Sequence, residues 1–222
     1  MRADFAVLLA STILATAASA APVPTHKGPP APARPRGDRA LTLLYDQTST
    51  PSGIGVVSQN FEASFDAYDC MAADDFIVPE GAVWKIKEVD ITGTYFDGSG
   101  PSRAQSIVFY KTARHLPGKE IVRFDGMEGD DHLGSFVIDL GKGVRLRPGH
   151  YWLSAQSTQD FISGGEWGWE ASSVRFNARS AWRNPGGGFQ TDCTDWGVEF
   201  RCLNFDKSEV ADHLFALRGH AI

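Results

Sequence analysis

The stretch that decides the fold is WKIKEVDITGTYF, residues 84–96. Its apolar side chains alternate with polar ones, but the phase of the alternation changes partway along. Trp84 and Ile86 stand at even positions, whereas Val89 and the later apolar residues stand at odd positions. Because side chains of a β-strand alternate with a period of two, an unbroken strand would point these two sets to opposite faces. A β-bulge near Lys87 restores a single inward face, so the segment predicts one long, bulged strand.

Similar runs of apolar and β-branched residues recur along the rest of the chain. Gly, Pro, Asp or Asn bound each run, and none keeps a 3.6-residue period over a helical length. We therefore predict an all-β fold, specifically a two-sheet antiparallel β-sandwich of jelly-roll type, with a closed barrel as the alternative. The expected strands are residues 41–46, 55–61, 74–78, 84–96, 105–112, 120–124, 134–140, 150–157, 166–172, 180–184 and 213–219.

The N-terminal segments predict export. Residues 1–20 carry Arg2 before an apolar run and end in a small-x-small cleavage site, which is typical of a signal peptide. The apolar run is shorter than the roughly 20 residues that a membrane anchor needs, and no later stretch is long and apolar enough to span a bilayer. Residues 21–40, rich in Pro and Ala and basic, read as a linker or tail. Residues 41–222 are expected to form one β-sandwich domain of a periplasmic or extracellular protein.

The charge of the chain bears on its partners. The formal net charge is −6, and the segment 21–40 is basic, so the remainder of the chain is more acidic still. Nucleic-acid binding rests on neutralisation of phosphates by Lys and Arg. We therefore expect no nucleic-acid partner.

Three cysteines fit an oxidising compartment. Cys193 and Cys202 flank the short segment TDWGVEFR, and a bridge between them would stabilise the fold by roughly 2–3 kcal/mol in the chain-entropy picture. Other pairings stay open at this level. Cys70 is then expected to be a buried structural thiol, since free cysteine is among the most buried residue types. The alternative, a nucleophilic cysteine, needs a histidine partner.

Several elements of the chain together resemble a known type of domain. They are ADDF at 73–76, the W-x-I strand that begins at Trp84, FYKTARHLPG at 109–118, GHYWLS at 149–154 and the closing FALRG at 215–219. In this order they resemble a class of bacterial secreted β-sandwich domains that occur alone or beside surface-anchoring, adhesion and hydrolase modules. The resemblance covers most of residues 41–219. It implies an extracellular β-sandwich and brings no catalytic residues with it.

Standard catalytic signatures are absent from the sequence. It contains no H-E-x-x-H, G-x-S-x-G or C-x-x-C motif and no Walker loop. Glu166 and Glu170 share a strand face but are roughly 13 Å apart at the usual strand rise, which exceeds the separation of about 5–9.5 Å in glycosidase pairs. A hydrolase site assembled from distant strands stays open as an alternative function.

The acidic segment FDAYDCMAADDF, residues 65–76, is a candidate calcium site. Calcium prefers six to eight oxygen ligands, which extracellular modules often supply from loop carboxylates and carbonyls. Asp74 and Asp75 are the first ligands that we would test for a structural calcium ion. Alternatively, one of them caps a turn or pairs with an arginine inside the fold.

The segment EWGWEAS, residues 166–172, offers two aromatic rings. Trp167 and Trp169 fall on one strand face, because they are two residues apart. Exposed rings in this arrangement can stack on sugars, so both are candidate ligand-binding residues. The opposing interpretation is that they pack in the core, because the other face carries Glu166, Gly168 and Glu170 and looks solvated.

These observations lead to a working hypothesis for the function. We expect a secreted, non-enzymatic β-sandwich that binds an extracellular ligand, with a carbohydrate or another cell-surface component as the leading candidate. The alternatives are a secreted hydrolase of polysaccharide or protein, and a structural or adhesive envelope protein.

Overall fold

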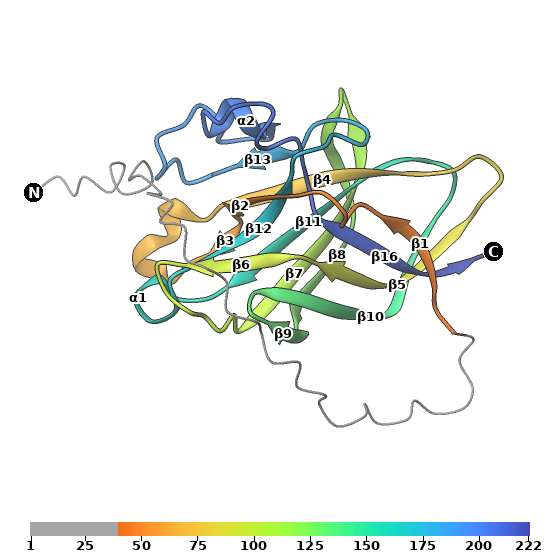
Figure 1. Cartoon of the computed structure of the whole chain (residues 1–222), viewed down its shortest axis with the longest axis horizontal. Helices are drawn as coiled ribbons and strands as arrows, with labels where there is room; N and C mark the ends of the chain where they lie inside the picture. The colour runs from red at the N-terminus through yellow and green to blue at the C-terminus, as the bar shows by residue number, and fades with distance from the viewer. Residues whose placement is uncertain (1–39) are drawn as a thin grey trace, which may run out of the picture. The chain divides into compact units, whose positions relative to one another are not determined.

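The computed structural model describes residues 40–222, and Leu41–Ile222 forms one compact unit. The predicted signal peptide and nearly all of the predicted linker lie outside the described residues. The described part is all-β, as expected (Figure 1). Its helices are short: a 3-10 helix at Ala63–Tyr68, α1 at Phe161–Gly164 and α2 at Glu199–Cys202. None of these helices is long and apolar enough to cross a membrane.

Hydrogen-bonded pairing divides the strands into three mainly antiparallel sheets. The five-stranded sheet runs in the order β1 (Thr42–Asp46), β16 (Phe215–Ala221), β5 (Trp84–Ile91), β10 (Ser135–Leu146) and β9 (Asp130–His132). The seven-stranded sheet runs in the order β14 (Gly197–Val198), β13 (Ala181–Arg183), β4 (Met71–Val78), β11 (Gly149–Thr158), β7 (Ala104–Ala113) and β8 (Leu116–Met127), with β3 (Gln59–Asn60) parallel to β11. The four-stranded sheet joins β15 (Asp212–His213), β12 (Glu166–Ser172), β2 (Pro51–Val57) and β6 (Gly93–Phe96).

Three sheets form where two were predicted because the segment 84–96 does not stay in one sheet. It breaks at Thr92, so that β5 belongs to the five-stranded sheet and β6 to the four-stranded one. The predicted bulge is confirmed: Glu88 pairs with Arg218 and Ile86 with Gly219, which leaves one extra residue on β5. The described strands do not close into a barrel, and their order does not show a jelly roll.

The core lies between the five-stranded and seven-stranded sheets, and Phe76 marks its centre. Its ring on β4 packs 6.4 Å from Trp84 and 6.4 Å from Phe215, both on the five-stranded sheet. Phe109 on β7 meets the same ring edge-on at 6.2 Å. Because these residues come from both sheets, burial of their apolar surface holds the two layers face to face.

The disulfide prediction is confirmed: Cys193 and Cys202 are bonded, and Cys70 is a free, buried thiol. The bridge ties the end of α2 to the irregular segment before it. Gly197 lies directly against it, since a Cβ there would come within 2.6 Å of the Cys193 sulfur. The disulfide therefore fixes α2 and the start of β14 as one local unit.

Candidate functional site

The two tryptophans of EWGWEAS are core residues. Trp167 and Trp169 each have 0% exposure. Both indole nitrogens are satisfied inside the fold, by donation to the carbonyl oxygens of Gly134 at 2.7 Å and Leu214 at 2.9 Å. Neither ring offers a face to a surface ligand, so the structure supports the core interpretation of this segment.

The opposite face of β12 differs from the sequence expectation. Glu166 is buried rather than solvated, and burial, together with the nearby Asp97, raises the pKa of its carboxyl to about 7. Gly168 is also buried, because a Cβ there would touch the backbone of Gly55 on the neighbouring β2 at 2.8 Å. The strand is therefore covered on both faces.

Asp74 and Asp75 have 0% exposure, and their oxygens are already used within the protein. Asp74 accepts hydrogen bonds from the Gln47 side chain and from the His213 backbone, each at 2.5 Å. Asp75 contacts His150 Nε2 and accepts the backbone N–H of Ala178 at 3.0 Å. Within residues 40–222, no three His, Cys, Asp or Glu side chains gather as a metal site requires. A structural calcium ion stays a prediction from the sequence alone.

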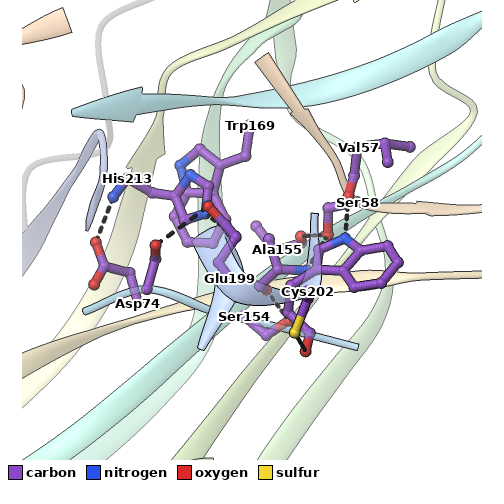
Figure 2. Close-up of polar contacts among 12 residues, drawn as sticks. Val57, Ser58, Asp74, Ser154, Ala155, Trp169, Glu199, Cys202 and His213 are labelled. Carbon is purple, nitrogen blue, oxygen red and sulfur yellow. Dashed lines mark hydrogen bonds and ion pairs between the residues drawn. The ribbon is translucent and has the colours of Figure 1, made fainter. Parts of the chain in front are cut away.

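A buried polar chain continues from Asp74 through His213 to Glu199, as Figure 2 shows. His213 Nε2 lies 2.8 Å from a Glu199 carboxylate oxygen, and both side chains have 0% exposure. The other carboxylate oxygen of Glu199 accepts the Ser180 hydroxyl at 3.2 Å. The His213 ring stacks on Trp169 at 4.6 Å. Since Glu199 is the first residue of α2, this chain anchors that helix to the core.

The surface above this chain contains a pocket of about 700 Å³. We call it the basic pocket, because five of its nine lining residues are basic. Its walls come from the tip of the β7–β8 hairpin, from the segment after β12, and from β14, α2 and the loop that follows. The lining residues are His115, Arg175, Asn177, Ala178, Arg179, Val198, Phe200, Arg201 and Lys207.

The cations of the basic pocket have no carboxylate partner among residues 40–222. The ion pairs within residues 40–222 are formed by other arginines and by two histidines, and none of these residues lines the pocket. Instead, Arg179 and Arg201 place their guanidinium groups 5.3 Å and 5.5 Å from the Phe200 ring centre. Arg179 also donates to the Lys207 carbonyl at 2.8 Å. Cation–π contacts of this kind hold the guanidinium groups without neutralising them.

Buried carboxyl groups hold the floor of the basic pocket from below. Asp212 accepts the backbone N–H of Phe176 at 2.5 Å, and Asp75 accepts that of Ala178. Between them, Asn177 donates its side-chain amide to the Tyr45 hydroxyl at 3.1 Å. These bonds order the segment that carries Arg175 and Arg179, although it has no regular secondary structure.

The carboxyl of Asp212 is shielded from water, and its pKa is raised to about 8. Burial is the largest cause and the charge of Asp75 adds to it, while the hydrogen bond from Phe176 and the charges of Arg175 and Arg179 limit the rise. Asp212 is therefore mostly protonated at neutral pH. A neutral Asp212 leaves the charge of the two arginines uncompensated, so the basic pocket keeps a positive potential.

The raised pKa of Asp212 predicts a pH-dependent stability. Between its ordinary value of 3.8 and about 8, the folded state binds more protons than the unfolded state. Stabilisation is therefore full at low pH and falls as pH rises through this window, by about 1.4 kcal/mol per unit of pKa difference. Asp212→Asn should flatten the dependence of unfolding free energy on pH, measured by urea denaturation.

The matched control is Asp192→Asn at an exposed carboxyl, which should keep the wild-type slope. Part of the slope should persist in Asp212→Asn, because burial also raises the pKa of Asp74. A slope in Asp212→Asn equal to that of the wild type would contradict the assignment.

Reasoning from the sequence missed the basic pocket, although a signal was present. SVRFNARSAWRN, residues 173–184, places arginines at 175, 179 and 183 within an otherwise acidic body. The net charge of the whole chain is negative and therefore concealed this local run of arginines. Arg201 and Lys207 join it only through the fold, because the disulfide and the Glu199–His213 contact bring α2 beside the segment.

Comparison with known proteins adds no further information. We found no protein family that matches the chain, no similar curated protein and no similar solved structure. The resemblance to bacterial secreted β-sandwich domains therefore stays a prediction.

Proposed function

We propose that the protein is a secreted, non-enzymatic binding protein of the β-sandwich, jelly-roll kind, and that its ligand is an anionic carbohydrate held in the basic pocket. The observation that carries this proposal is a pocket of about 700 Å³ with four Arg and Lys side chains and no carboxylate partner in the described chain. These cations gather in a chain whose net charge is −6. Local charge of the opposite sign to the whole molecule favours a specific anionic partner.

The shape and chemistry of the pocket support a sugar acid over a small inorganic anion. Guanidinium groups match carboxylate and sulfate oxygens with paired hydrogen bonds. Phe200 lines the same pocket and supplies apolar surface, which can face the C–H side of a sugar ring. The volume also lies within the 300–1,000 Å³ range that is typical of organic ligands.

The hydrolase alternative has no comparable support. Asp74, Asp75 and Asp212 are grouped, but each has 0% exposure. A general acid or nucleophile must reach its substrate within hydrogen-bond distance. We therefore assign these carboxyl groups to holding the pocket floor and not to catalysis.

The test uses two polymers that share a backbone and differ in charge: polygalacturonate and its fully methyl-esterified form. Isothermal titration should show binding of the free acid and none of the ester, because the ester lacks the carboxylates that the arginines bind. Dextran sulfate and neutral dextran form the second pair and distinguish sulfate from carboxylate recognition. Binding of neither charged polymer, or equal binding of charged and neutral polymers, would overturn the proposal.

A further inference from the structure

A further cation–aromatic contact lies outside the basic pocket. The Arg183 guanidinium sits 4.5 Å from the Trp196 ring centre, and Trp196 in turn meets Tyr110 edge-on at 5.8 Å. Arg183 and Trp196 are both half-buried. Like the cations of the basic pocket, Arg183 forms no ion pair with any carboxylate of residues 40–222. Its Nε is buried and has no hydrogen-bond partner.

This contact and the basic pocket lie on the same side of β13. Trp182 points into the main core and donates to the Val57 carbonyl at 2.9 Å. Ala181 points the other way, into a small outer cluster against which Ala178 and Trp196 pack. Since strand side chains alternate, Arg183 shares the side of Ala181.

The two contacts are connected through β13 and β14. Arg179 lies in the irregular segment before β13, and Arg183 is the last residue of β13. β14 pairs with β13 through Ala181 and Val198, and Val198 also lines the basic pocket. The paired strands β13 and β14 therefore carry one cationic contact towards each end.

We propose that Arg183 and Trp196 form a second subsite for the ligand of the basic pocket, which makes that ligand a polymer with anionic groups at intervals, laid across β13 and β14. The inference rests on the proposed function, because it extends the same binding surface. The chemical class is an acidic polysaccharide that bears carboxylate or sulfate groups. A single sugar acid would fill only the pocket.

The charge distribution favours such a polysaccharide over a nucleic acid. Duplex DNA carries one negative charge per roughly 1.7 Å of its axis, and a protein with a net charge of −6 repels so dense a polyanion. Two separate cationic contacts, one in the basic pocket and one at Arg183, match a polymer with sparser charges. Duplex DNA binding more tightly than polygalacturonate at equal salt would overturn the inference.

The test is isothermal titration with oligogalacturonates of two lengths, a dimer and an octamer. Wild-type protein should bind the octamer about tenfold more tightly than the dimer, because a cation–π and charge contact is worth a factor of this order. Arg183→Ala and Trp196→Ala should lose this advantage and keep the wild-type affinity for the dimer. Sulfated dextran fragments of two lengths repeat the test for sulfate.

The controls separate this inference from the proposed function. Lys142→Ala removes an exposed cation from β10 and should leave both affinities unchanged. If the alanine variants fail to fold, Arg183→Lys and Trp196→Phe take their place. The first keeps the positive charge and the second keeps an aromatic ring. Equal affinity of the wild type for dimer and octamer, or equal weakening of both by Arg183→Ala, would overturn the second subsite. If the wild type binds neither length of the galacturonates nor of the sulfated fragments, the proposed function fails as well.

Discussion

Replacing Trp169 by alanine should lower the free energy of unfolding by about 3–5 kcal/mol, the usual cost of truncating a buried aromatic residue. The ring has 0% exposure. It stacks on His213 at 4.6 Å and packs against Phe215 at 6.0 Å. Its removal would open a cavity where the polar chain beneath the basic pocket meets the main core.

Urea denaturation of Trp169→Ala measures this loss, and Trp169→Phe separates its causes. Phenylalanine preserves most of the packing but loses the hydrogen bond to Leu214, so it should cost less than alanine. Trp196→Ala is the matched control, because that ring is half-buried at the surface and its loss should cost clearly less. Unchanged stability in Trp169→Ala would show that this ring is not a core residue.

Replacing Arg179 and Arg201 together by alanine should reduce the affinity for polygalacturonate at least tenfold. Charge-assisted hydrogen bonds contribute roughly 1.5–3 kcal/mol each, and tenfold corresponds to about 1.4 kcal/mol. Both guanidinium groups flank Phe200 and line the basic pocket. The stability should change by less than about 1 kcal/mol, because Arg201 is exposed, Arg179 is only half-buried, and neither forms an ion pair with a carboxylate of residues 40–222.

A charge-matched control tests whether position or total charge matters. Lys142→Ala and Arg145→Ala together remove the same two charges from exposed sites on β10. This control should bind polygalacturonate as tightly as the wild type. If it weakens binding as much as the pocket variant does, the protein attracts polyanions only through its general charge, and the basic pocket is not the site.

Local patterns in the sequence were sufficient for the all-β class, for most of the strands and for the disulfide. The phase change around Lys87 located the bulge, since a period-two pattern registers even a single extra residue. Cys193 and Cys202 were close enough in sequence to pair without knowledge of the fold. These features depend on neighbours along the chain, which is why they could be predicted.

Features that depend on distant contacts could not be predicted in the same way. Nothing near Glu166 in the sequence indicates that it is buried, and nothing near Gly168 indicates its tight approach to Gly55 on the paired strand β2. The number of sheets depended on the break at Thr92, where the chain passes from one sheet to the next. Pairing across the fold, rather than propensity, decided both features.

The candidate site depends both on neighbours along the chain and on distant contacts. Arg175 and Arg179 stand in a visible run of arginines, but their meaning depends on which carboxyl groups lie near them in space. Only the fold brings the charges of both arginines close enough to act on Asp212, which is buried and has a raised pKa. The sequence instead indicated Asp74 and Asp75 as ligands, but in the fold they accept the backbone N–H groups of His213 and Ala178.

The most direct test of the account is the affinity of the wild-type protein for polygalacturonate and for its methyl ester, measured over a series of NaCl concentrations. The account predicts binding of the free acid alone, with an affinity that falls as salt screens the charges in the basic pocket. Equal affinity for the acid and the ester, or an affinity for the acid that does not change with salt, would contradict it.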